Sequence, residues 1–130
     1  MASIFTKIVR GEIPAYKIAE NENFLAFLDI FPVVKGHTLV IPKQEVDYIF
    51  DLEDQILSDL HLFSKQVAKA LKASLGCQRI SVIVAGFEVP HAHIHLIPSN
   101  SMEDLSFSHK LKLAPEEFVI LAEQIRTHWV

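Results

Sequence analysis

The 130-residue sequence predicts an α+β fold with an antiparallel sheet, because strand-like runs follow one another as in hairpins while helical segments stand apart from them. Two helical patterns support this class: a long amphipathic segment in the middle of the chain and a helix-start signal near its C-terminus. Half of the residues are hydrophobic and 22% are charged, which is typical of a globular protein. No repeat or linker is visible, so we expect residues 1–130 to form a single domain.

Short runs rich in branched and aromatic residues predict a sheet of about five strands. The runs are residues 16–19, 24–29, 38–41, 80–85 and 93–97. The first two flank a polar tetrapeptide and therefore predict a hairpin, and prolines close the third and the fifth. The fourth run is β-branched, so we expect it to be buried. Residues 99–114 carry no clear pattern.

The clearest helix is expected at residues 51–75, where apolar residues recur at steps of three and four. They are Leu52, Ile56, Leu60, Phe63, Val67 and Leu71. Asp51 is the expected cap at its start, and Gly76 suits its end. A short N-terminal helix is expected from the spacing of Ile4, Phe5 and Ile8. A C-terminal helix is expected to begin at Pro115, with Phe118, Leu121 and Ile125 facing inward.

Charge and cysteine content exclude several kinds of protein. The net charge is -4, and proteins that hold nucleic acid by its backbone need a basic surface, so we expect no nucleic-acid partner. No uncharged apolar stretch is long enough to cross a bilayer, and the first residues lack the apolar run of a signal peptide. We therefore expect a cytoplasmic protein with no membrane partner. Cys77 is the only cysteine, so neither an internal disulfide nor a thiolate zinc cluster can form within one chain, and we expect it to be inert.

Three histidines near residue 93 carry the chemical signal. In the segment 90–98, His91, His93 and His95 alternate with apolar residues. If the segment is extended throughout, the three imidazoles form a row on one face, about 7 Å apart. Imidazoles are poor core residues, because burial leaves their donors and acceptors without partners. The spacing favours either a zinc site or nucleophilic attack on a phosphate by a neutral imidazole, and does not decide between them.

A resemblance to a known family rests on three segments. Residues 91–97 match the pattern His-φ-His-φ-His-φ-φ, with φ apolar, at every position. Residues 29–43 look like the segment that leads from a ribose-binding aspartate to a fourth histidine, and residues 4–15 are similar to the opening of one branch. In this order, the segments resemble the histidine triad family, in its Hint branch of nucleotide-binding proteins.

This resemblance implies a sheet-based α+β subunit that pairs into a homodimer with a continuous sheet. It also implies two-step hydrolysis of a nucleoside 5′-phosphate derivative without metal or other cofactor. His93 matches the nucleophile that forms a nucleotidyl-histidine, His95 the histidine near the phosphate and leaving group, and His91 and His37 two orienting histidines. Asp29 matches the carboxylate that accepts the ribose hydroxyls. The implied purine pocket is lined by Phe5, Ile8, Phe27, Ile30 and Leu39, which pattern alone would equally assign to the core.

The sequence departs from the family at two places. Ser3 and Thr6 stand where many relatives carry a pair of zinc-binding cysteines, so we expect no such zinc. Phe87 and Glu88 stand where relatives carry Gln and a phosphate-contacting Ser or Thr. A carboxylate repels phosphate, so one hypothesis is that Glu88 faces the leaving group and favours an amine-bearing one. The alternative is that Glu88 points to solvent.

The expected activity is hydrolysis of purine nucleoside phosphoramidates or aminoacyl adenylates, releasing AMP or GMP. Three alternatives stay open: a nucleotide-binding regulatory module, a dinucleoside polyphosphate hydrolase, and a metalloprotein that uses the histidine row for zinc. Three further histidines lack context and are expected on the surface, namely His61, His109 and His128. Trp129 is expected either at a dimer interface or packed on its own helix.

Overall fold

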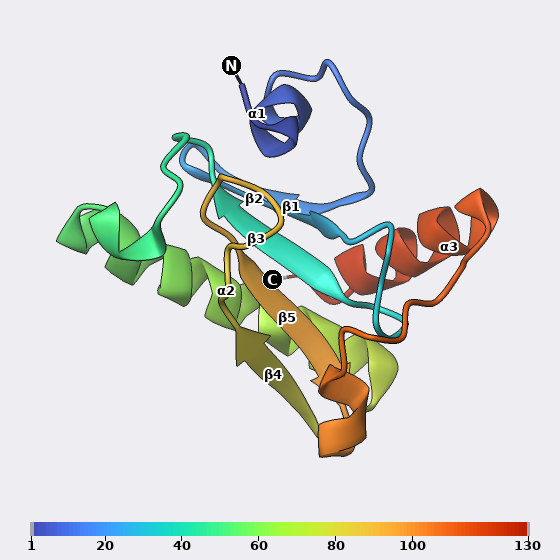
Figure 1. Ribbon diagram of the computed structural model, residues 1–130. Helices are drawn as coiled ribbons and strands as arrows, with labels where there is room; N and C mark the ends of the chain where they lie inside the picture. Colours follow the sequence, from blue (N-terminus) through green and yellow to red (C-terminus); the bar gives the residue numbers. More distant parts are fainter. Residues whose placement is uncertain (1, 130) are drawn as a thin grey trace.

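The computed structural model describes residues 2–129, and within them it shows one five-stranded antiparallel sheet in the order β1-β2-β3-β5-β4 (Figure 1). The strands are β1 (Lys17–Glu20), β2 (Phe24–Leu28), β3 (Thr38–Pro42), β4 (Arg79–Ile83) and β5 (Ile94–Ser99). The helices are α1 (Ile4–Val9), α2 (Asp54–Leu75) and α3 (Pro115–Arg126). The α+β class, the number of strands and their antiparallel pairing are confirmed.

The two faces of the sheet support separate apolar clusters, because successive side chains of a strand point to opposite faces. On β2, Phe24 and Ala26 pack in the cluster shared with α2 and α3, whereas Leu25 and Phe27 pack in the cluster shared with α1. α1 therefore covers the face opposite to α2 (Figure 1). On β5, Ile94 packs in the cluster shared with α2 and α3. The next residue, His95, therefore faces α1.

Two expectations for β4 and α2 are wrong. Among the described residues 2–129, β4 is an edge strand whose partner is β5, and its residue Val82 is 57% exposed. A β-branched run favours a strand but does not specify a neighbour on each side. The helix α2 begins at Asp54, after a separate 3-10 turn at Ile49–Asp51, so Asp51 is not its cap. Its end is as expected, because Gly76 adopts a left-handed φ of 66°.

Pro98 does not end β5, which continues to Ser99. The pairing of β5 with β3 extends only to Leu96, so at Pro98 the strand has a neighbour on one side and a missing N–H is tolerated. Residues 99–114, which had no clear pattern, form a 3-10 turn at Met102–Leu105 and then a loop. The loop is tied to the β2–β3 connection, because the Leu111 N–H donates to the Pro32 carbonyl at 2.7 Å.

Gly36 shapes the connection that carries the fourth histidine. Its φ is +93°, and a Cβ here would overlap the side chain of Leu75 in α2. The positive φ favours glycine whatever the space around it, and the next residue is His37. At the other end of the chain, Trp129 packs on Phe63 of α2, with ring centroids 5.8 Å apart, and lies against the cluster that α2 and α3 share.

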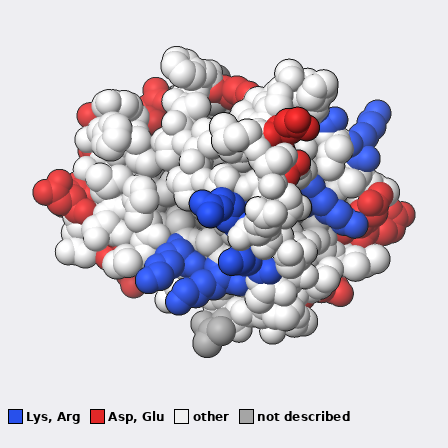
Figure 2. Space-filling model, turned by 90° about the horizontal axis from the view of Figure 1, so that it is seen from below, with Lys and Arg blue, Asp and Glu red and all other residues white. Residues whose placement is uncertain are grey.

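The surface carries both signs of charge. On the face seen from below, Lys and Arg side chains gather in the middle and lower part of the view, and acidic side chains lie mainly toward its margins (Figure 2). Net charge alone therefore does not describe every face, and the absence of a nucleic-acid partner stays a prediction.

Among the helices of residues 2–129, none combines the length and apolar character that crossing a bilayer demands.

Candidate active site

The three histidines of the triad do not form one extended row. β5 begins at Ile94, and the chain before it turns, with the His91 N–H donating to the Val89 carbonyl at 2.8 Å. The rings of His93 and His95 lie side by side with centroids 4.9 Å apart, whereas the ring of His91 contacts the N-terminal end of α1. The condition for a single row, an extended chain from His91 to His95, is therefore not met, and the strand expected at 93–97 begins one residue later. All three side chains are nevertheless buried on the α1 side.

The hydrogen bonds of His93 fix its tautomer. Its Nδ1 lies 2.7 Å from the carbonyl oxygen of His91, and a carbonyl can only accept, so Nδ1 carries the proton. The lone pair is then on Nε2. Because His93 lines the cavities described below, this nitrogen is available to a ligand. The ring is held edge-on to Phe5 of α1 with centroids 5.1 Å apart, which restricts its rotation.

His37 and His95 form a second defined pair. The Val33 N–H donates to Nδ1 of His37 at 3.1 Å, so the proton of His37 is on Nε2, which donates to Nδ1 of His95 at 2.9 Å. In neutral His95 the remaining proton is then on Nε2. Burial, together with the nearby Lys110 ammonium and His93, lowers the pKa of His37 to about 4. Burial and the neighbouring His93 and His37 lower the pKa of His95 to about 3. Both rings are therefore neutral at pH 7.

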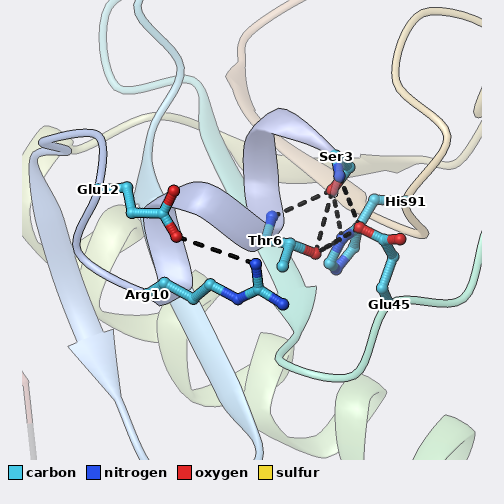
Figure 3. A network of polar contacts seen from close by, with 6 residues as sticks. All are labelled: Ser3, Thr6, Arg10, Glu12, Glu45 and His91. Atoms are coloured by element: carbon cyan, nitrogen blue, oxygen red, sulfur yellow. Dashed lines mark hydrogen bonds and ion pairs between the residues drawn. The ribbon is translucent and has the colours of Figure 1, made fainter. Parts of the chain in front are cut away.

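His91 is held by two partners outside the triad, of which Figure 3 shows Ser3. Its Nε2–H donates to the Pro42 carbonyl at 2.8 Å, and its Nδ1 lies 2.8 Å from the Ser3 hydroxyl. Burial lowers the pKa of His91, so it is neutral and Nδ1 accepts. Ser3 and Thr6, which stand in the place of the cysteine pair, thus lie against His91 and take part in its hydrogen bonding.

A cavity of about 310 Å³ opens beside these histidines, between α1 and the sheet. It is lined by every residue expected to bind nucleotide, namely Phe5, Ile8, Phe27, Asp29, Ile30, Leu39 and Glu88, and by His93 and His95. Four of the apolar ones are also buried in the α1-side cluster, so their core and lining roles coincide. Ile30 differs, because it is 53% exposed and lies at the mouth. Sequence reasoning missed Ile13 and Val89, whose positions on the wall follow from loop conformation rather than any pattern.

Asp29 serves a turn and faces the site at the same time. Its Oδ1 accepts the Phe31 N–H at 2.9 Å, and its Oδ2 lies 3.6 Å from Nε2 of His37. An ionised carboxylate has lone pairs to spare beyond the single turn hydrogen bond, so Asp29 can still accept hydroxyl donors from a ligand. The turn role and the proposed ribose role are compatible.

A second cavity of about 130 Å³ is also lined by His93 and His95. Glu88 lines both cavities, and Phe87, which is 97% exposed, borders the second with its flanking residues. Phe107 closes it from the loop after β5, with its ring 5.1 Å from His95 and the Lys110 ammonium 4.9 Å from its centre. Sequence reasoning missed Phe107 and Lys110, because no motif links this loop to the histidines.

Within the part of the chain that the structure describes, the group arranged to hold a metal is Asp29, His37 and His95, whose ligand atoms lie within 4.8 Å of one another. It differs from the expected row, since His91 and His93 are not part of it. The 2.9 Å contact between His37 and His95 is a hydrogen bond, so an ion would have to displace its proton.

As expected, His61, His109 and His128 are exposed.

The chain is similar to known proteins in sequence and in fold. The family model described as HIT domain matches residues 10–102. The adenosine 5′-monophosphoramidase of Schizosaccharomyces pombe is 39% identical over 132 residues, covering 96% of each chain. That of Saccharomyces cerevisiae is 41% identical over 98 residues, covering 75% of this chain and 62% of the yeast protein.

Solved structures show the same fold. A Hit-like protein from Bartonella henselae superposes with a TM-score of 0.86 at 30% identity, over 97% of this chain and 95% of that one. A zinc-bound histidine triad family protein from Mycobacterium smegmatis gives a TM-score of 0.84 at 29% identity, over 99% and 94% of the two chains. On its motif, its fold and these relatives, the chain belongs to the HIT, or histidine triad, family.

Proposed function

We propose that this protein hydrolyses purine nucleoside 5′-phosphoramidates or related aminoacyl adenylates, releasing AMP or GMP through a nucleotidyl-histidine at His93. The observation that carries the proposal is the hydrogen bond from Nδ1 of His93 to the His91 carbonyl, which leaves the Nε2 lone pair beside the cavity and next to His95. The similarity to two yeast adenosine 5′-monophosphoramidases supports this substrate class.

In the first step, Nε2 of His93 attacks the α-phosphorus and a P–N bond forms. The bond from phosphorus to the leaving amine breaks, and its electron pair stays on the amine nitrogen. Neutral His95 has no spare proton at pH 7, so we assign its Nε2–H to a hydrogen bond with a phosphate oxygen, and the amine takes its proton from water. The imidazolium of the adduct donates from Nδ1 to the His91 carbonyl, which stabilises its charge.

In the second step, water attacks phosphorus, the P–N bond to His93 breaks, and the electron pair returns to Nε2. The water proton passes to solvent, and the nucleoside monophosphate leaves. The purine occupies the apolar cavity between α1 and the sheet, and Asp29 accepts the ribose hydroxyls at its mouth. Each role uses the chain's own residues.

The test is a quenched reaction with adenosine 5′-phosphoramidate in EDTA, followed by peptide mass spectrometry. An adenylyl adduct on His93 is the expected result. AMP binding without adduct or turnover would instead favour a nucleotide-binding module. Turnover that disappears in EDTA and returns with zinc would favour a metalloenzyme, and the Asp29, His37 and His95 group would be its site. Parallel assays with a dinucleoside polyphosphate test that alternative substrate.

For the leaving group, we propose that Glu88 selects an amine-bearing one. The support for this role is that Glu88 lines both cavities and is exposed, so its carboxylate can meet a solvated amine. Glu88→Ser is expected to lower the preference for a lysyl over an uncharged amine leaving group by about fivefold, the size of a partly solvated charge interaction. The measurement is the ratio of kcat/KM for the two substrates, with exposed Glu22→Ser as control. Equal changes for both substrates would overturn this role.

We also propose a homodimer in which the open edge of β4 pairs with a second copy. The edge carries exposed apolar side chains, and more lie on the adjoining segments. They are Val82, Val84, Phe87, Tyr48 and Phe50. In analytical ultracentrifugation we expect a dimer, and Phe50→Glu is expected to shift it toward monomer because the charge would be buried. A monomeric wild type would contradict this assembly.

A further inference from the structure

We propose that Glu45 is a positioning residue, which fixes His91, and through it His93, by binding the N-terminal end of α1. No sequence motif points to Glu45, which is exposed and lies in the segment between β3 and α2. Its kinetic test rests on the proposed function, whereas its spectroscopic test does not.

The carboxylate of Glu45 binds two donors of α1 with one oxygen (Figure 3). The Ser3 backbone N–H and the Thr6 hydroxyl each donate to Oε1 at 2.6 Å. These two hydrogen bonds lower the pKa of Glu45 to about 2, so it is ionised whenever the protein is folded near neutral pH. Charge-assisted bonds of this length are among the stronger ones in proteins.

Because the Thr6 hydroxyl donates to Glu45, it cannot also donate to His91. The Ser3 hydroxyl has two acceptors within reach, Oγ1 of Thr6 at 3.3 Å and Nδ1 of His91 at 2.8 Å, and His91 is the nearer. The Thr6 N–H donates to the Ser3 hydroxyl oxygen at 3.0 Å, which is the cap of α1. The Ser3 hydroxyl is then the donor left for Nδ1 of His91, 2.8 Å away, and Nε2–H of His91 donates to Pro42. The Thr6 hydroxyl oxygen, 3.3 Å from Nδ1, has no proton to offer it.

The network ends at the nucleophile. With its ring fixed at both nitrogens, His91 holds its carbonyl against Nδ1–H of His93 at 2.7 Å. That hydrogen bond keeps the lone pair of His93 on Nε2, where the proposed chemistry needs it. Loss of the carboxylate would free the Thr6 hydroxyl and the Ser3 N–H, and the Ser3 hydroxyl would lose its fixed direction. α1 itself stays packed, because Phe5 and Ile8 are 6% and 7% exposed.

The first measurement is a double-mutant cycle on the rate of adenylyl-His93 formation in single turnover. Glu45→Ala and Ser3→Ala are each expected to slow this step about tenfold, and the double variant also about tenfold, since both act through the same bond to His91. Glu45→Gln keeps an acceptor oxygen and is expected to stay within about threefold of wild type. The matched control is Glu12→Gln, an exposed carboxylate beside α1 whose partner is Arg10.

A role confined to the cavity wall would give a different result. We expect the Kd for AMP to change less than about twofold in Glu45→Ala, because α1 remains packed. A weaker Kd with an unchanged rate, or independent losses that multiply to about a hundredfold in the double variant, would overturn the proposal. If Glu45→Ala does not fold, Thr6→Val removes the hydroxyl donor with little change of shape and is expected to show the same coupling to Ser3→Ala.

A readout independent of turnover separates this proposal from the proposed function. Side-chain ¹⁵N spectra of the histidines are expected to show His93 as a single Nδ1–H tautomer in the wild type and as a mixture of tautomers in Glu45→Ala. If the wild type forms no adduct, the proposed hydrolysis fails while the spectra still test Glu45. If the adduct forms and neither its rate nor the spectra respond to Glu45→Ala, the positioning role fails alone.

Discussion

Replacing His93 by alanine is expected to lower kcat/KM for an adenosine phosphoramidate by at least about 10⁴-fold, the usual cost of removing a covalent nucleophile. Among the described residues, neither of the other two triad histidines has a free lone pair that could replace that of His93 Nε2. Nδ1 of His95 accepts from His37, and both nitrogens of His91 are engaged. The affinity for AMP is expected to persist, because the apolar cavity and Asp29 are unchanged.

The measurement is steady-state turnover in EDTA together with calorimetric titration of AMP. The matched control is His109→Ala, which removes an exposed histidine from the loop after β5 and is expected to leave both quantities unchanged. Residual turnover within tenfold of wild type would show that His93 is not the nucleophile. If AMP binding and turnover were both lost, the cavity itself would be damaged in His93→Ala. The experiment would then be repeated with His93→Gln.

Acidification is expected to destabilise the fold steeply. The pKa of His37 is about 4 in the folded protein, because burial and the nearby Lys110 disfavour its charged form, and is near 6.5 when the chain unfolds. As the pH falls below 6.5, the unfolded state binds a proton that the folded state cannot, so the free energy of unfolding decreases. From pH 7 to pH 4 the loss from His37 alone is about 3 kcal/mol, and it levels off below pH 4.

His95 acts in the same direction, down to its pKa of about 3. The free energy of unfolding from urea titrations between pH 7 and pH 4 measures the effect. His37→Gln is expected to flatten this dependence, because the amide does not titrate, whereas His61→Gln at an exposed position is expected to leave it intact. A wild type whose stability is constant over this range would contradict a neutral, buried His37–His95 pair.

The sequence predicts much of the frame because local patterns decide it. The short apolar runs of β2 and β3 and the three-four spacing of α2 depend on neighbouring residues alone, and the structure contains these elements. Boundaries that depend on tertiary contacts were less well predicted. The strand β5 begins only at Ile94, and α2 begins only at Asp54, after a separate turn. Local propensity did not predict these starts, because it does not specify which hydrogen bonds a packed neighbour offers.

The histidine motif, the aspartate before it and the apolar residues that surround them can be recognised in the sequence. How these residues act together depends on contacts that form only in the folded chain. The fold places β4 at an open edge, brings Phe107 against the His37–His95 pair with Lys110 over the Phe107 ring, and joins Glu45 to the start of α1. The physical reason is that hydrogen-bond direction and burial arise between residues far apart in the chain, such as Glu45 and Ser3, and no spacing rule encodes such contacts.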